Sequence, residues 1–553
     1  MSISKISILA SILLFMSSCG LSTMSSKYET VNINVTPSTL QVHGDKVGLT
    51  IDANFPEKYF AKNATIDFTP VLVFDGGEAE FKTITVQGES AIGGEATIFY
   101  ANGGSFSYQD KINYSDEMLN SELELRATGK SKDKEAVFPA KKIASGVLAT
   151  SKRIENTENI LDANSEYEYE TILEETATIY FLVNASNIRS TEKSNSDLEK
   201  LEEFAKLGNK THSIEVKSFA SPEGSVNLND NVSDKRAAST LKYAKRLLKK
   251  VKLDGASNNE LYVEKSEGED WEGFNELMRK SEIKDKRRIT KIVNSVEDLE
   301  LRERAIRDMA EIYDAIEKNV LPQLRKAQIT VRSYQPKKSD STISVLANSS
   351  PNELSLKELL HAASLSTEEK NKIDIYNKAV QIHNNWKGLN NIATIHLNNN
   401  DLDKAYQHLS KAEKLSKESD EIKNNLGVVA AWKGQYTKAQ NYFNKCKSSE
   451  ENQALLSIRK GDYKKASRYF KNKKSHNAAL AKILNGNNSL CNEKTAACDY
   501  LNAISSARSG NSNLVIKYLK SAIDLDSKYK NEASMDLEFI KFKENTDFQN
   551  LLN

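Results

Sequence analysis

Hydrophobic and polar residues follow different patterns in successive parts of this chain. Between residues 28 and 153, runs such as "ETVNINVTP" and "TPVLVF" alternate or are continuously apolar, and glycine-containing turns such as "DGG" and "ANGG" separate them. Short strands with frequent turns are typical of an immunoglobulin-like β-sandwich. The sequence therefore predicts an all-β domain over 28–153.

From residue 171 to 334 the pattern changes to strands that alternate with amphipathic helices. The runs "ATIYFLV", "HSIEVKSFA", "NELYVEKS" and "AQITVRSY" predict four strands, and "SDLEKLEEFAKL" and "VSDKRAASTLKYAKRLLKK" predict helices between them. This order favours an α/β domain with a mixed sheet and helices on one face. Residues 268–325 hold three further helical patterns between the third and fourth strands, which predicts a helical insertion.

A Ser/Asn/Pro-rich stretch, 335–352, predicts a linker, and the residues after it are helical and repetitive. Ala393 is matched by Gly427, and Ala405 by Ala439, in each case 34 residues later. A 34-residue period with small residues where helices cross resembles tetratricopeptide repeats. This resemblance predicts an all-α superhelix over 353–553, whose concave surface receives segments of partner proteins.

The N-terminus predicts export. Lys5 precedes the apolar run "ISILASILLFM", which is followed by small residues and a cysteine in "MSSCG", so residues 1–18 are predicted to be a signal peptide. The run is shorter than the roughly 20 residues that a membrane-spanning helix needs. The "MSSCG" stretch resembles the lipobox of bacterial lipoproteins, although Met16 stands where leucine is usual. The alternative is an ordinary cleaved signal with an incidental cysteine.

The lipobox resemblance implies a location as well as a modification. Cys19 would be acylated and would anchor the chain in the outer membrane, with 19–27 as a short tether. No acidic cluster follows Cys19 in "CGLSTMSSK", which favours the periplasm-facing leaflet; exposure at the cell surface is the alternative.

The α/β region carries a second resemblance. Its order of strands and helices, and the stretch "NDNVSDKRA" from Asn229 to Ala237, are similar to the OmpA C-terminal-like family, which binds peptidoglycan. The family signature is Asn-x-x-Leu-Ser-x-x-Arg-Ala, and here Val232 replaces the leucine. Domains that carry "ASPEG" together with such an insertion resemble envelope lipoproteins of the Bacteroidota.

The resemblance implies a two-charge clamp. In the family, an aspartate after the second strand and the signature arginine bind the ammonium and carboxylate of diaminopimelate in the peptidoglycan stem peptide. Arg236 matches the arginine and Asn229 begins the signature, but Ser221 stands at the aspartate position. Glu223 is the candidate substitute for the missing acid. Peptidoglycan binding is therefore expected to be weak.

Composition and cysteine content narrow the function classes. Lys and Arg number 77 against 76 Asp and Glu, a net charge of +1, so nothing indicates a nucleic-acid partner. Cys491 and Cys498 are close enough in sequence to form a disulfide in an oxidising compartment, with free thiols as the alternative. Cys446 lies in a helical pattern and is expected to be a packing residue.

No set of residues predicts catalysis. The seven histidines are scattered, and His383, His396 and His408 lack the spacing of metal ligands. Nucleophile-elbow and phosphate-loop motifs are also absent from the sequence, so neither enzyme activity, cofactor nor metal is expected. The sequence favours an envelope scaffold. The alternatives are an accessory subunit of an outer-membrane assembly or secretion machine, whose OmpA-like domain docks protein, and an enzyme hidden in the β domain.

Overall fold

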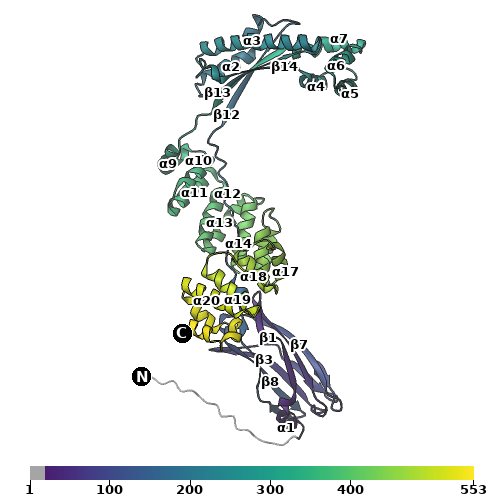
Figure 1. The fold of residues 1–553 in the computed structure, drawn as a ribbon, viewed down its shortest axis with the longest axis vertical. Coiled ribbons are helices and arrows are strands. Elements are labelled where there is room, and N and C mark those ends of the chain that lie inside the picture. The colour runs from purple at the N-terminus through teal and green to yellow at the C-terminus, as the bar shows by residue number, and fades with distance from the viewer. Residues whose placement is uncertain (1–18) are drawn as a thin grey trace. The chain divides into compact units, whose positions relative to one another are not determined.

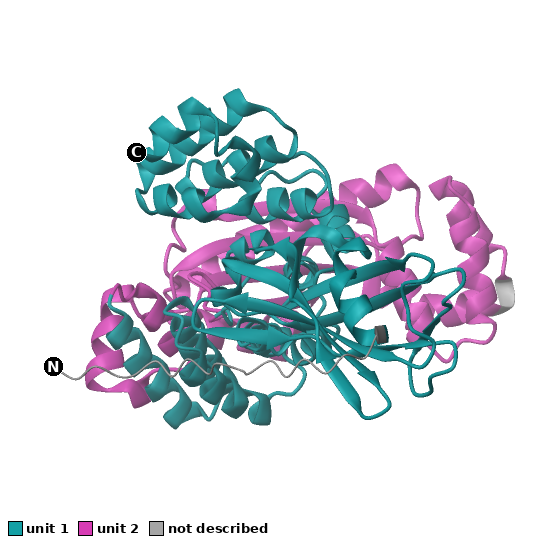
Figure 2. Cartoon of the chain, turned by 90° about the horizontal axis from the view of Figure 1, so that it is seen from below, with its two compact units in different colours: residues 1–164, 368–553 teal, residues 165–367 magenta. Residues whose placement is uncertain are grey.

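The computed structural model describes residues 19–553, so the predicted signal peptide, residues 1–18, lies outside the described part (Figure 1). The chain forms two compact units, coloured separately in Figure 2. One contains the residues up to 164 together with 368–553, and the other contains residues 165–367. In sequence, the second unit is thus inserted between two parts of the first.

The N-terminal part of the first unit is built from two sheets. Their strand orders are β11-β1-β2-β7 and β10-β8-β3-β5-β6, with β4 added at β3 and β9 at β8. The strands are β1 (Asn32–His43), β2 (Lys46–Phe55), β3 (Thr65–Phe74), β4 (Gly77–Glu80), β5 (Ile84–Gly88), β6 (Ala96–Ile98), β7 (Gly104–Asn113), β8 (Ser121–Ser131), β9 (Lys134–Val137), β10 (Lys141–Ser145) and β11 (Val147–Leu148). Three 3₁₀ helices accompany them, η1 (Tyr28–Thr30), η2 (Asp116–Leu119) and η3 (Thr150–Arg153).

The two sheets share one hydrophobic core. The ring centroid of Phe68 on β3 lies 6.0 Å from that of Phe55 on β2 and 5.6 Å from that of Phe106 on β7. Alternate residues of β2 and β8 are buried, as the period of two requires for a sheet with one face inward. The prediction of a β-rich N-terminal region is therefore confirmed.

The expected tether after Cys19 is instead a helix, α1 (Cys19–Ser26), that packs on these sheets. Leu21 and Met24 are buried in the shared core, and the Tyr59 hydroxyl donates a hydrogen bond of 2.9 Å to the carbonyl of Met24. The polar residues of "GLSTMSSK" concealed these two apolar positions, which lie three residues apart and so on one face of a helix.

The C-terminal part of the first unit consists of helices, and the predicted helical region is confirmed. The elements are α11 (Glu369–His383), α12 (Trp386–Asn398), α13 (Leu402–Leu415), α14 (Asp420–Trp432), α15 (Tyr436–Phe443), α16 (Glu450–Arg459), α17 (Tyr463–Tyr469), α18 (His476–Leu484), α19 (Ala496–Arg508), α20 (Ser512–Leu525), α21 (Lys528–Met535), the 3₁₀ helix η7 (Leu537–Phe542) and α22 (Thr546–Leu552). Sequential helices pair, as α12 does with α13, α14 with α15 and α19 with α20.

Small residues let the paired helices approach each other. A Cβ atom added to Gly427 on α14 would lie 2.4 Å from the ring of Phe443 on α15, so no larger residue fits there without movement. Ala393, Ala405 and Ala439, the other residues of the 34-residue alignment, have no exposed surface. The close packing of the paired helices therefore explains why small residues recur at these positions.

The second unit contains a four-stranded mixed sheet of order β12-β15-β13-β14. Its strands are β12 (Ile172–Tyr180), β13 (Thr211–Ala220), β14 (Tyr262–Glu269) and β15 (Lys326–Tyr334), and β13 and β14 are parallel. Helices α2 (Ser196–Lys206) and α3 (Val226–Lys250) share a single core with the inward residues of the sheet. The opposite face carries charged pairs such as Arg332 with Glu174 and Glu215. Two 3₁₀ helices, η4 (Thr191–Ser194) and η5 (Asn259–Leu261), lie in its connections.

The insertion before β15 is divided into more helices than the three expected. They are α4 (Trp271–Lys280), α5 (Lys286–Ser295), α6 (Leu299–Arg307), α7 (Ala310–Asn319) and α8 (Leu321–Leu324), and they have a small core of their own. The expected linker 335–352 also contains a helix, α9 (Asp340–Ser349), followed by η6 (Pro351–Glu353) and α10 (Leu356–Leu365). Helix α9 begins where the Ser339 hydroxyl accepts the Thr342 N–H, and it buries Ile343 and Ala347.

Among residues 19–553, no helix combines the length and the apolar character needed to cross a membrane.

Candidate functional site

A row of buried asparagines lies along the first helices of the repeats. Asn391 is on α12, Asn425 on α14, Asn452 on α16 and Asn477 on α18, and each is at most 4% exposed. Buried amides need hydrogen-bond partners, because an unsatisfied polar group costs stability. Here the partners belong to a segment far away in sequence, residues 155–163.

Each of these asparagines binds both backbone groups of one residue of this segment. The side-chain oxygen accepts the N–H, and the side-chain NH₂ donates to the carbonyl oxygen. The pairs are Asn477 with Glu155 (3.0 and 2.9 Å), Asn452 with Asn159 (2.7 and 3.0 Å), Asn425 with Leu161 (2.9 and 2.8 Å) and Asn391 with Ala163 (2.7 and 3.0 Å). The segment therefore runs along the repeats in the direction opposite to their order in sequence.

A second set of contacts links these pairs into one network. Asn390 donates to the carbonyl of Leu161 at 2.9 Å. Asn425 also donates to the side chain of Asn390 at 3.0 Å. Because one residue of an extended strand presents its N–H and C=O on the same side, a row of amides can bind alternate residues whatever their side chains are. We call residues 155–163 the seated segment and this row the asparagine ladder.

Two side chains of the seated segment make specific contacts. The Glu158 carboxylate has no exposed surface; it lies 3.0 Å from Arg459 and accepts a 2.7 Å hydrogen bond from the indole N–H of Trp432. The Asp162 carboxylate accepts a hydrogen bond of 2.5 Å from the Thr394 hydroxyl. The backbone contacts hold the chain, and these two acids fix its register.

Sequence analysis assigned residues 154–170 to no domain and did not identify the ladder. A signal was present: Asn390 and Asn391 recur as Asn424 and Asn425 at the same 34-residue spacing as the packing residues. Paired amides at a repeated position between apolar residues indicate a buried polar surface with a ligand. The seated segment itself has no such signal, since its partners are distant in sequence.

The residues of the predicted clamp lie elsewhere, in the second unit, and each binds within the chain. Arg236 is 2% exposed and donates to three carbonyl oxygens, of Ala185 (2.9 Å), Phe219 (2.9 Å) and Leu182 (3.1 Å). Burial, together with the charge of Arg325, lowers the pKa of Arg236 to about 10. It therefore stays charged at neutral pH while its donors stabilise the loops around it.

Glu223, the candidate substitute for the missing acid, is paired with Arg325. Arg325 donates to both carboxylate oxygens, from Nε at 2.8 Å and from Nη2 at 2.7 Å. The Ser221 hydroxyl donates to Glu223 at 2.9 Å, so Ser221 and Glu223 are brought together, as the clamp requires. However, the guanidinium occupies the carboxylate face that a ligand's ammonium would need, because a bidentate pair uses both oxygens.

Asn229 binds a carboxylate next to the insertion. Its side chain donates to Glu269 at 2.7 Å, and Trp271 donates to the other oxygen of Glu269 at 2.8 Å. Glu303 on α6 is 1% exposed, and burial, followed by its hydrogen bond to Glu269, raises the pKa of Glu303 above the usual range of a carboxyl group. Arg307 pairs with Glu303 at 3.1 Å and opposes this shift, so the insertion places a carboxyl group with a raised pKa against the residue that Asn229 binds.

The cysteines are the remaining residues for which the sequence predicts a role. A disulfide joins Cys491 and Cys498, while Cys446 is half-buried and burial raises the pKa of its thiol to about 11. Within residues 19–553, one group of three metal-ligand types lies close together, Cys491, Glu493 and Cys498, and its two cysteines are bonded to each other. Cys19 is the first residue of α1.

Comparisons with known proteins found similarity to solved structures of low sequence identity. No protein-family model matches the sequence, and no curated protein matches it. Among solved structures, a tetratricopeptide repeat protein from Parabacteroides merdae is 16% identical, with 36% of this chain and 91% of that chain covered and a TM-score of 0.29. YrrB, a TPR protein with an unusual peptide-binding site, is 15% identical over 37% of this chain and 100% of its own, with a TM-score of 0.23.

A third structure, the anaphase-promoting-complex hetero-tetramer Cut9-Hcn1, is 12% identical over 65% of this chain and 60% of that one, with a TM-score of 0.23. The class of the C-terminal region follows from its own architecture. Helix pairs follow one another, with α12 and α14 beginning 34 residues apart and later pairs more closely spaced; a small residue lies at the α14–α15 crossing, and an extended segment lies against the first helices. Residues 368–553 therefore form a series of paired helices with the architecture that tetratricopeptide repeats have.

Proposed function

We propose that this protein is a non-catalytic scaffold of the bacterial envelope, anchored by lipid at Cys19, that binds proteins through its repeats and its OmpA-like domain. The observation that carries the proposal is the asparagine ladder. Four side chains that each bind both backbone groups of one residue form a receptor for extended polypeptide, and catalysis has no use for such a row.

The seated segment gives this receptor a structural role in the first unit. Glu155 to Ala163 follow η3 directly, and η3 is itself fixed to the last repeats, because Arg153 pairs with Glu532 at 2.9 Å and Asp536 at 3.1 Å. The repeats and the β-sandwich are thereby joined through both side chains and backbone. A joined platform of this kind presents its remaining surface to partners in a fixed arrangement.

For the OmpA-like domain, the internal pairing favours protein docking over peptidoglycan binding. Glu223 is neutralised by Arg325, and the donors of Arg236 bind carbonyl oxygens, so both charges of the expected clamp are used within the chain. This favours the role of accessory subunit in an outer-membrane assembly or secretion machine. A weak link to peptidoglycan is the second candidate, supported by the Arg236 and Asn229 signature.

The scaffold role is tested by crosslinking in living cells. Tyr406 on α13 is 39% exposed, and a photo-crosslinking amino acid at this position should form adducts with specific envelope proteins. Buried Tyr500 serves as the matched negative position. Absence of adducts at Tyr406 would contradict the scaffold role. Cys19→Ala should move the protein from the membrane fraction to the soluble fraction; a variant that stays with membranes in high salt would contradict the anchor.

The two candidates for the OmpA-like domain are separated by calorimetric titration with one diaminopimelate-containing muropeptide. Weak or undetectable binding by the wild type is expected, since the clamp has lost one charge-assisted contact of about 1.5–3 kcal/mol. Arg325→Ala together with Ser221→Asp should restore binding if the groove is otherwise open. Tight wild-type binding that is lost in Arg236→Ala would show that peptidoglycan is the ligand.

A further inference from the structure

A cavity lies beside the seated segment, within the first unit. Its volume is about 630 Å³, and it is bounded by residues 155 and 157–160, by the first residues of α16 and α18, and by the loop before α19. Neither the asparagine ladder nor the side chains of the seated segment fill this cavity. Its polar lining determines what it can bind.

The lining is acidic. Four carboxylates border the cavity, and two of them have cationic partners, Glu158 with Arg459 and Glu451 with Lys473. The other two, Glu155 and Glu493, have no Lys or Arg within ion-pair distance in the part of the chain that the structure describes. The cavity therefore retains negative charge that its own chain does not neutralise.

A buried histidine adds a second, independent feature. His476 lines the cavity and is 3% exposed. Its Nε2 donates to the carbonyl oxygen of Arg153 at 2.7 Å, because a carbonyl can only accept, and this leaves Nδ1 of the neutral ring as an acceptor. Nδ1 has no hydrogen-bond partner among the described residues, and it faces a Glu155 oxygen at 3.9 Å.

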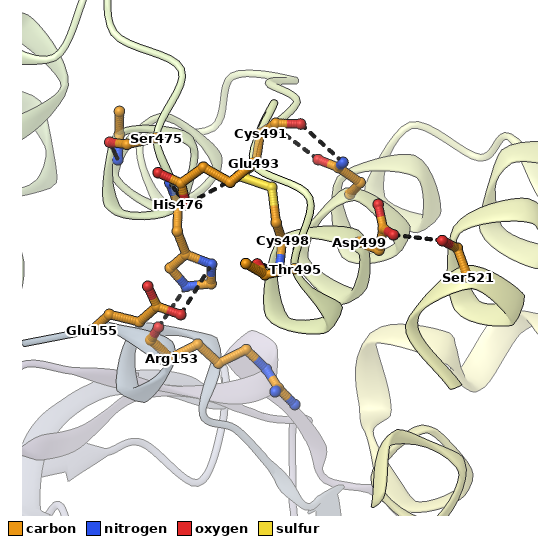
Figure 3. Close-up of a disulfide and its surroundings, with 12 residues drawn as sticks. Arg153, Glu155, Ser475, His476, Cys491, Glu493, Thr495, Cys498, Asp499 and Ser521 are labelled. Carbon is orange, nitrogen blue, oxygen red and sulfur yellow. Dashed lines mark hydrogen bonds and ion pairs between the residues drawn. A yellow bond between two sulfur atoms is a disulfide. The ribbon is translucent and has the colours of Figure 1, made fainter. Parts of the chain in front are cut away.

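The loop that carries Glu493 is held in place from both sides, as Figure 3 shows. The disulfide between Cys491 and Cys498 closes the loop, and the Glu493 carboxylate accepts the backbone N–H of His476 at 3.2 Å. Glu155 approaches the imidazole of the same residue from the seated segment. Glu493 therefore contacts the backbone of His476 and Glu155 faces its ring, so a carboxylate from each side of the cavity lies close to this residue.

We propose that this cavity binds a primary ammonium or guanidinium group, the lysine or arginine side chain of a protein partner. A donor-rich cation can donate hydrogen bonds to the unpartnered imidazole nitrogen and to the unneutralised carboxylates, and its charge offsets theirs. The inference rests on the proposed protein-binding role of the repeats, and it specifies the chemistry that the partner must have.

The test is a titration of the full chain, labelled with ¹³C in its histidine rings, with Nα-acetyl-lysine amide. The ring signal of His476, identified by its loss in His476→Gln, should shift saturably. Nα-acetyl-norleucine amide, which has a similar stem without the charge, should produce no saturable shift. An equal response to both compounds, or no saturable response to the lysine compound, would overturn the proposal.

Charge variants separate the cavity from general electrostatics. Glu155→Gln and Glu493→Gln should each weaken binding of the lysine compound by about tenfold or more, since each removes a charge-assisted contact. Glu450→Gln is the matched control, because Glu450 is exposed at the start of α16 and does not line the cavity. An equal loss in Glu450→Gln would overturn the proposal. If the wild-type chain does not bind the lysine compound but still forms crosslinks at Tyr406, this inference is overturned and the scaffold role stands.

Discussion

Asn425→Ala removes one complete rung of the asparagine ladder. In the wild type the Asn425 side chain is fully buried and makes two hydrogen bonds to Leu161, of 2.9 and 2.8 Å. The variant leaves the Leu161 N–H without its partner, which costs about 1–3 kcal/mol for a buried donor. The carbonyl keeps its bond from Asn390, so loss of the second contact adds about 0.5–1.5 kcal/mol.

The free energy of opening the seated segment should therefore fall by about 1.5–4.5 kcal/mol. Hydrogen exchange measures this directly, because an amide exchanges when its segment opens locally. Since every 1.4 kcal/mol is a factor of ten, the Leu161 amide should exchange between about 10-fold and about 1500-fold faster in the variant. Mass spectrometry of peptides that span residues 155–163 gives the rate.

The control is Asn441→Ala, at an exposed asparagine on α15, which should leave the exchange rate of the segment unchanged. Amides on strands of the β-sandwich serve as an internal control for global unfolding in both variants. The reasoning is refuted if the Leu161 amide exchanges freely in the wild type, or if Asn425→Ala accelerates it less than a few-fold. Either result would mean that the ladder does not hold the segment in solution.

Three further predictions follow from single positions. Glu158→Gln removes the negative partner of buried Arg459 and should lower the unfolding free energy of the first unit by about 3 kcal/mol, measured by urea denaturation. Glu303 has a raised pKa, so between its unfolded and folded pKa values the folded state holds a proton that the unfolded state has released. The stability of the wild type should therefore fall as the pH rises from 5 to 8. Glu303→Gln should remove that decrease, as measured by hydrogen exchange in the second unit. Gly427→Val forces a side chain against Phe443 and should destabilise the repeats by about 1–3 kcal/mol, measured as a lower thermal midpoint; an unchanged midpoint would contradict the close packing.

Local signals made much of the fold predictable. The strands and helices of the second unit follow periodicity within each segment, and the repeats follow the spacing of Ala393 and Gly427. Helix α9 was not predicted, because the Ser- and Asn-rich sequence around Ile343 and Ala347 has low helix propensity. Burial of these two residues, one helical turn apart, stabilises α9 through tertiary contacts that propensity does not include.

The site was less predictable, since its contacts are distant in sequence. The pairing of Glu223 with Arg325 joins residues 102 positions apart, and neither residue's neighbours indicate the other. The bond from Asn391 to Ala163 spans 228 positions. A resemblance indicates which residue types occupy a signature, but it does not indicate whether the rest of the chain already binds them.

The central claim is that the repeats form a receptor for extended polypeptide, which the chain's own segment occupies. It is tested most directly with a fluorescent peptide of residues 154–164 and a variant of the full chain that carries Leu161→Pro and Ala163→Pro. Proline has no N–H to donate to the side-chain oxygens of Asn425 and Asn391. The variant's own segment should therefore dissociate from the ladder and leave it open to the peptide.

Circular dichroism first establishes that the variant keeps its helices. The account then predicts saturable binding of the peptide to the variant, none to the wild type, and none of a peptide that carries the same two prolines. Failure of the peptide to bind the folded variant, or equal binding to variant and wild type, would contradict the account.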